Sequence, residues 1–284
     1  MDNHENNPKS IKYYVKRFIQ ANATYFKGKK VVDLPAGNGV TSRILDEVEA
    51  EVIPFDLFPE YFNYDALECK RADVLKGMPL EDDSVDYIIC QEGIEHFTDQ
   101  FKALQEFNRI LKKGGSLLIT TPNYSNLQSR FSYFLSESER FNQILPPNEI
   151  DSIWMNNQTL SSEIYFGHVF LIGVQKLRVL SKLAGFNIKR IIFTRARTTS
   201  IILLILSYPL IYLSNLITYF KNIRKLKSNE RNYKKKVYRE VFKLSVNIKL
   251  LIDSHLFIEF EKCEHFNEVM KNLKSVHQDF SNQT

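Results

Sequence analysis

The first residues with possible chemistry form a short turn, Pro35-Ala36-Gly37-Asn38-Gly39, which follows the acid Asp33. Gly37 and Gly39 allow the backbone to take positive φ angles and to approach a ligand closely. Asp33 can face a cationic group of that ligand. Pro35 has no N–H, so the turn is poorly suited to a pyrophosphate, which needs several backbone donors. The turn is either a loop for a different ligand or a simple connection.

Two more carboxylates follow. Asp56 comes about 20 residues after the turn, the spacing at which an acid binds the two hydroxyls of a ribose. Asp73 can accept a hydrogen bond from an adenine amino group. Each acid ends or follows a short apolar segment, and we therefore expect the three to lie at one edge of a sheet. This pattern favours a nucleoside-containing ligand.

A second group is Glu92, Glu95 and His96. On a helical turn, positions i, i+3 and i+4 share a face, so the three side chains can converge. Two carboxylates and an imidazole suit a divalent cation such as Mg, Mn or Zn. His96 can instead serve as a general base without metal. The remaining alternative is that these residues only order the loop and pack the helix.

The elements that would position these residues alternate along the chain. Strands are expected at 31–34, 51–55, 87–90, 116–120, 186–193 and 255–260, and helices at 10–25, 41–48, 101–111 and 174–183. This order predicts an α/β fold, a mostly parallel sheet with helices on both faces. Ligands in such folds bind at the carboxyl ends of the strands. Residues 124–165 lack periodicity and are expected to form a loop or cap.

Five ordered segments of the chain resemble class I S-adenosylmethionine-dependent methyltransferases of the type 11/23 kind. They read VVDLPAGNG, VIPFDLFPE, MPLEDDSVDYIICQEGIEHF, EFNRILKKGGSLLITTPN and LRVLSKLAGFNIKRI. The resemblance covers about residues 10–193, and 255–260 would be the seventh strand of a Rossmann-like sheet. Pro35-Ala36 departs from the glycine and small residue that are usual in this family. The acceptor of the methyl group is not indicated by these motifs.

The resemblance implies S-adenosyl-L-methionine as the cofactor and assigns residues to it. Asp33, Gly37 and Gly39 would border the methionine end, Asp56 and Leu57 the ribose, and Asp73 and Val74 the adenine. Gln91 would lie under the sulfonium or the acceptor. The string E-x-x-E-H resembles the metal site of two related groups, which act on ubiquinone precursors and on 2′-hydroxyls of small RNAs. His168 would complete a site with Glu92, Glu95 and His96, and His96 or His168 would be the catalytic base.

Residues 201–220 contain no charge and reach transmembrane length. Residues 221–250 then carry eleven Lys or Arg against two Glu, which favours an anionic partner for this region. A simple span would conflict with pairing of 186–193 and 255–260 in one sheet. A hairpin bent at Pro209, lying in a membrane interface, fits better. A buried helical pair or a dimer interface is the alternative.

The expected organisation is a methyltransferase core at 1–198, a hydrophobic and basic helical insertion at 199–250, and the last strand with a tail at 251–284. The three cysteines are widely spaced and the first ten residues are polar, so a cytoplasmic protein is expected, peripheral on the cytoplasmic membrane face. The function expected is O-methylation of a membrane-proximal or lipid-linked small molecule or glycan. The alternatives are RNA 2′-O-methylation and cofactor binding without catalysis.

Overall fold

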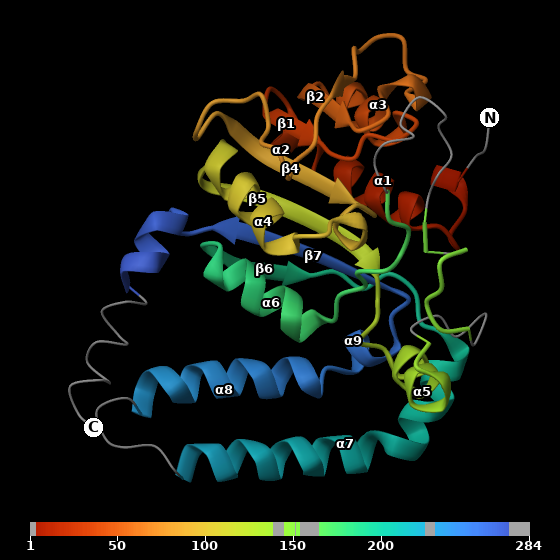
Figure 1. Ribbon diagram of the computed structural model, residues 1–284, viewed down its shortest axis with the longest axis vertical. Coiled ribbons are helices and arrows are strands. Elements are labelled where there is room, and N and C mark those ends of the chain that lie inside the picture. The colour runs from red at the N-terminus through yellow and green to blue at the C-terminus, as the bar shows by residue number, and fades with distance from the viewer. Residues whose placement is uncertain (1–3, 139–144, 151, 154–164, 225–230, 273–284) are drawn as a thin grey trace.

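The computed structural model describes residues 4–138, 145–150, 152–153, 165–224 and 231–272 of the 284-residue chain. Its centre is a seven-stranded sheet in the order β3-β2-β1-β4-β5-β7-β6 (Figure 1). The strands are β1 (Lys30–Asp33), β2 (Glu51–Asp56), β3 (Lys70–Arg71), β4 (Val85–Gln91), β5 (Leu111–Pro122), β6 (Phe186–Ile191) and β7 (His255–Lys262).

The sheet is parallel except at β7, which pairs antiparallel with both β5 and β6. The carboxyl ends of β1, β2, β4, β5 and β6 therefore meet at one edge, together with the beginning of β7. We call this the ligand edge. The expected Rossmann-like sheet of seven strands is confirmed, and so is the pairing of the sixth and seventh strands.

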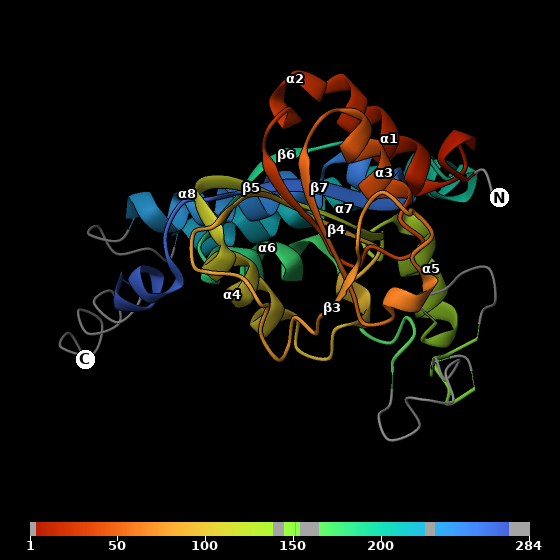
Figure 2. The ribbon, with the colours of Figure 1, turned by 90° about the horizontal axis from the view of Figure 1, so that it is seen from above.

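Helices cover both faces of the sheet (Figure 2). On one face, α1 (Ile11–Ala21), α2 (Ala23–Phe26) and α3 (Val40–Glu47) bury an apolar core that includes Val15, Ile44 and Leu118. On the other face, α4 (Gln100–Ile110) and α6 (Val174–Leu183) bury Leu104, Phe107 and Leu177. Short 3-10 turns lie at His4–Asn6, Pro59–Tyr61 and Ile94–His96.

The segment expected to be irregular contains a helix, α5 (Leu127–Ser136). Asn126 caps it, because its Oδ1 accepts the Ser129 N–H at 2.8 Å. This helix was not predicted from periodicity, because several of its large apolar side chains face outward. Phe134 is 83% exposed and Leu135 is 55% exposed. The buried side of α5 includes the polar residues Gln128 and Ser132.

The hydrophobic insertion is a pair of long helices, α7 (Thr198–Arg224) and α8 (Arg231–Ser245), which run side by side beyond α6 (Figure 1). Aromatic contacts of Tyr212 and Tyr219 with Phe242 join them. The expected hairpin at Pro209 is wrong, because Pro209 lies inside α7, which continues to Arg224. The chain reverses between α7 and α8 instead, and α9 (Ile248–Ile252) then leads into β7.

Candidate functional site

Asp33 ends β1 and is completely buried at the ligand edge. Its Oδ2 accepts a hydrogen bond from the Ser42 hydroxyl of α3 at 2.6 Å, whereas Oδ1 has no hydrogen-bond partner among the described residues. Burial, with a smaller contribution from the nearby charge of Asp56, raises the pKa of Asp33 to about 7. A cation placed here would lower that pKa and stabilise the carboxylate, because opposite charges attract strongly in a buried site.

The predicted turn is held by Asp56 at the end of β2. The N–H of Gly37 donates to Asp56 Oδ2 at 2.8 Å, and the N–H of Phe58 donates to Oδ1 at 2.9 Å. Gly37 and Gly39 have φ angles of 53° and 82°, which explains why glycine is needed at both positions. Each carboxylate oxygen keeps acceptor capacity for a ribose hydroxyl.

Pro35 contacts the loop that follows β4. A Cβ atom on Gly93 would lie 2.4 Å from Pro35 Cδ, so the proline ring fills the space that the missing side chain leaves. The turn after β1 and the turn after β4 therefore pack directly on each other. This contact gives Pro35 a structural role where the family motif has glycine.

A pocket of about 320 Å³ opens at this turn. Thr41 and Gln91 form part of its wall, and the Thr41 hydroxyl donates to Gln91 Oε1 at 2.8 Å. Lys12 of α1 donates to Asn38 Oδ1 at 3.0 Å. The lining residues are His4, Ser10, Ile11, Lys12, Pro35, Ala36, Gly37, Asn38, Val40, Thr41, Gln91 and Glu92.

Six of the eight predicted cofactor residues do not line this pocket, and Asp33 and Asp56, described above, are two of them. Gly39 caps α3, and Leu57 uses its carbonyl to accept from Arg71 at 2.5 Å. Asp73 accepts the N–H of Leu75 at 2.9 Å, and Val74 is buried beside a separate groove. The assignment of these six residues to the cofactor therefore remains a prediction, whereas Gly37 and Gln91 lie in the pocket wall itself.

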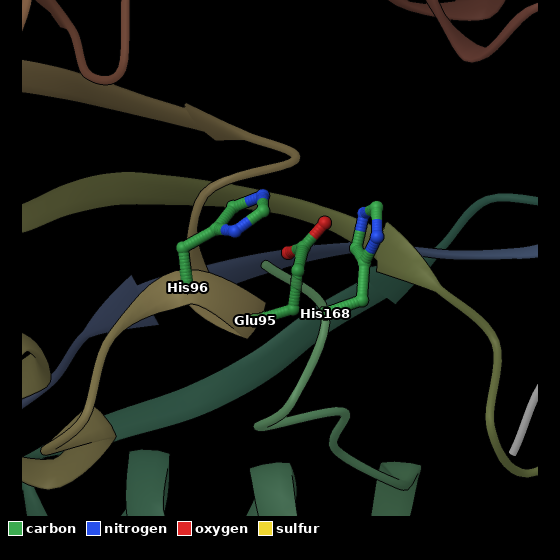
Figure 3. Close-up of side chains that lie close together, drawn as sticks. All are labelled: Glu95, His96 and His168. Carbon is green, nitrogen blue, oxygen red and sulfur yellow. The ribbon is translucent and has the colours of Figure 1, made fainter. Parts of the chain in front are cut away.

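Three of the four predicted metal ligands come together, namely Glu95, His96 and His168. One ligand atom from each lies within 4.8 Å of the others, and the imidazole centroids are 5.0 Å apart. Figure 3 shows the Glu95 carboxylate between the two rings. Both Glu95 oxygens are buried without a hydrogen-bond partner among the described residues, and burial raises the pKa of this carboxyl.

The orientation of His96 is fixed by the backbone. Its Nδ1 lies 2.9 Å from the carbonyl oxygen of Phe166 and 3.1 Å from that of Gly167. Carbonyl oxygens only accept, so Nδ1 carries the hydrogen and Nε2 of the neutral ring has a free lone pair. Histidines that bind metals typically donate their other N–H in this way.

Glu92 points to a different set of partners. It accepts a hydrogen bond from the Thr120 hydroxyl at 3.1 Å, and its Oε2 lies 3.7 Å from His255 Nε2. Burial, then the charge of Glu95, raise the pKa of Glu92 well above its usual value. Burial, then the charges of Arg197 and Arg195, lower the pKa of His255 to about 4. His255 is therefore uncharged near neutral pH.

Several site residues were missed by sequence reasoning. Lys12, Thr41 and Ser42 hold or line the turn, yet as single polar residues on expected helices they carry no motif. His255 lies opposite Pro122 in the register of β7 on β5. Its place at the ligand edge follows from the antiparallel pairing of β7, which turns the first residue of that strand toward the site.

A family model described as a methyltransferase domain matches residues 6–191. A probable S-adenosylmethionine-dependent methyltransferase from Mycolicibacterium smegmatis is 31% identical over 100 residues, 34% of this chain and 39% of the relative. A ubiquinone biosynthesis O-methyltransferase from Xanthomonas oryzae pv. oryzae is 26% identical over 59% of this chain and 74% of the relative. The match thus spans well under half of the first of these two relatives.

Solved structures show the same fold. A SAM-dependent methyltransferase from Archaeoglobus fulgidus aligns with a TM-score of 0.51 at 17% identity, over 91% of this chain and 97% of that one. One from Mesorhizobium loti aligns with a TM-score of 0.50 at 12% identity, over 91% and 99% of the two chains. At this level of identity the likeness concerns the fold alone.

Proposed function

We propose that this chain, which belongs to the class I S-adenosylmethionine-dependent methyltransferases, methylates a hydroxyl group of a membrane-proximal or lipid-linked small molecule or glycan. The family supplies the cofactor, S-adenosyl-L-methionine, and the reaction class. The nature of the acceptor is our inference. It rests on how the long apolar helix is attached to the ligand edge.

The observation that carries the proposal is the outer face of α7. This helix is long and apolar enough to cross a bilayer by length and composition, yet none of its apolar window is buried inside the protein. Its exposed side chains include Ile205, Leu206 and Leu210, of which Leu206 and Leu210 are four residues apart and lie on the same helical face. Soluble monomers rarely expose so large an apolar surface.

In this proposal α7 lies parallel to the membrane surface and does not cross the bilayer, because of how it is connected to the sheet. α7 begins shortly after β6 and α8 returns through α9 to β7, so both ends of the pair are attached at the ligand edge of one sheet. Lys221 and Arg224 lie in the last turn of α7, and α8 adds several lysines. An apolar face flanked by cations suits the cytoplasmic surface of an anionic bilayer.

The residues at the ligand edge have distinct tasks. Asp56 would accept the ribose hydroxyls, Gln91 and Gly37 would border the reacting end of the cofactor, and Asp33 would face the ammonium group. Methyl transfer is an in-line displacement from a sulfonium, so the protein would mainly orient the acceptor and exclude water. The acceptor hydroxyl would lose its proton to Nε2 of His96 or to His168, which lie beside Glu95.

The donor set also fits a divalent cation. A buried carboxylate without a partner is unfavourable, and Glu95 would be stabilised by a metal held together with His96 and His168. A bound cation would polarise the acceptor hydroxyl and lower its pKa. Glu92, the fourth predicted ligand, would then act next to the ion from its position between Thr120 and His255.

The relatives add support for a hydroxyl acceptor. The Xanthomonas relative is named as an O-methyltransferase of ubiquinone biosynthesis. Its alignment with this chain covers 74% of the relative. We extend only the reaction type to this chain. The lipid-like character of the acceptor is argued from α7.

The test incubates the full chain with methyl-labelled S-adenosylmethionine and a cell extract separated into lipid, RNA, protein and small-molecule fractions. Label in the lipid fraction, stable to mild base, supports the proposal. Label in RNA would favour 2′-O-methylation, and cofactor binding without label in any fraction would favour a non-catalytic binding protein. The Asp56→Ala variant is the control, because it should lose cofactor binding and all label while remaining folded by circular dichroism.

A further inference from the structure

Two arginines at the ligand edge, Arg195 and Arg197, have no carboxylate partner among the described residues. They follow β6 in an extended segment whose middle residue, Ala196, pairs antiparallel with Asp253. Alternate residues of extended chain point to the same side, so the two guanidinium groups share one side of this segment. The Nε atom of each is buried and has no hydrogen-bond partner within the described ranges.

The carboxylate that lies opposite the middle of this segment, Asp253, already has other partners. Asp253 accepts the backbone N–H of Thr194 at 2.8 Å and that of Arg195 at 3.1 Å, and it also binds the Thr194 hydroxyl. It holds the backbone of the segment in place. The pair is therefore two like charges side by side, and burial together with the charge of Arg195 lowers the pKa of Arg197.

The two arginines lie next to the proposed reaction site, and His255 connects them to it. Glu92 lines the cofactor pocket, and its Oε2 is 3.7 Å from His255 Nε2. The N–H of Ser254, the residue before His255, donates to the Arg195 carbonyl oxygen at 2.9 Å, so the backbone of the arginine segment runs beside His255. The positive charges of both arginines lower the pKa of that ring. The apolar helix α7 begins at Thr198, directly after Arg197. The pair therefore lies between the reaction site and the proposed membrane face.

We propose that Arg195 and Arg197 together bind a phosphate or diphosphate group. Two guanidinium groups offer paired N–H donors that match phosphate oxygens, and a dianion offsets both charges. This inference rests on the proposed function only in taking the neighbouring pocket as the acceptor site. The phosphate belongs either to the acceptor, whose hydroxyl then extends past His255, or to a lipid headgroup at the start of α7.

The first test uses inorganic pyrophosphate and inorganic phosphate as probes in titration calorimetry, with cofactor binding measured on the same samples. Arg195→Gln/Arg197→Gln should weaken pyrophosphate binding by about tenfold or more, because charge-assisted hydrogen bonds are lost. The double lysine variant should bind pyrophosphate with intermediate affinity. Lysine keeps the positive charge but lacks the paired N–H donors of a guanidinium group. Arg224→Gln, at the far end of α7, should bind like the wild type.

The proposal is overturned if the wild type does not bind pyrophosphate or if the glutamine variant binds it equally well. It also fails if that variant loses cofactor binding as well, since the pair would then be a structural element. Wild-type protein that binds pyrophosphate but no S-adenosylmethionine would instead reject the proposed function and leave the phosphate site standing.

A second experiment distinguishes a phosphate on the acceptor from a phosphate in a lipid headgroup. Vesicles of phosphatidylcholine with or without phosphatidic acid are mixed with the protein, and pyrophosphate is the competitor. If pyrophosphate and the glutamine variant both abolish the preference for phosphatidic acid, the pair binds a lipid headgroup. If the preference is unchanged while soluble pyrophosphate binding depends on the pair, the pair binds the phosphate of the acceptor.

Discussion

The exposed face of α7 should control binding to lipid bilayers. Ile205, Leu206 and Leu210 are 74%, 75% and 71% exposed, so each would transfer most of its side chain from water into the interface. Replacing all three with serine removes this apolar area while leaving the contacts between α7 and α8 in place. The helix itself should persist, because serine is tolerated in long helices at a modest cost.

The expected loss of membrane affinity can be worked out from the exposed fraction of the three side chains. Full burial of a leucine or isoleucine side chain contributes about 1.5–3 kcal/mol, and about three quarters of that is available here. The three residues together contribute about 3.4–6.8 kcal/mol, which corresponds to a change of at least roughly 300-fold in the partition coefficient. Electrostatic attraction of the basic residues would remain, so residual binding should become sensitive to salt.

The assay is flotation with vesicles of phosphatidylcholine and phosphatidylglycerol, at low and high salt. The wild type should float at both salt concentrations, and the triple variant only at low salt. Val179→Ser on α6, where the side chain is 45% exposed, is the matched control and should float like the wild type. Equal flotation of the triple variant and the wild type would refute the role of this face, as would a wild type that does not float.

Three other outcomes are expected. Between about pH 4 and pH 7 the folded protein keeps a proton on Asp33 that the unfolded chain has lost, so the free energy of unfolding should fall by about 4 kcal/mol as pH rises. Urea titrations of Asp33→Asn should lack this slope, and an unchanged slope would contradict the raised pKa. Gly93→Ala should cost about 1–3 kcal/mol of stability through its clash with Pro35, and Pro35→Gly should relieve most of that cost in a double-mutant cycle. Glu95→Gln should lower the single-turnover rate by about a hundredfold with cofactor affinity unchanged, and an unaltered rate would remove this cluster from the reaction.

Local patterns in the chain determined the core fold. Short apolar segments alternate with amphipathic helices, and a parallel sheet covered on both faces is the arrangement that buries them. Asp33 and Asp56 could be placed at the ligand edge because each ends a strand, and parallel strands end at the same edge. Gly37 and Gly39 could be recognised because the tight turn requires positive φ.

Other features depended on contacts between distant segments. His168 was indicated only by resemblance, and it reaches Glu95 because the chain returns to the ligand edge after α5. The outward apolar side chains of α5 gave no helical pattern. Pro209 predicted a hairpin, but the helix continues past it to Arg224, and α8 provides the returning helix.

Periodicity and turn chemistry within short windows of the chain predict the sheet, the order of its elements and the carboxylates at its strand ends. The packing of Pro35 on Gly93, and the position of Arg195 and Arg197 beside Ser254 and His255, depend on contacts between segments that are distant in the chain. For the two arginines, the cause is the antiparallel strand β7. It returns the chain from the α7–α8 pair to the ligand edge, and no local pattern encodes which side chains then meet there.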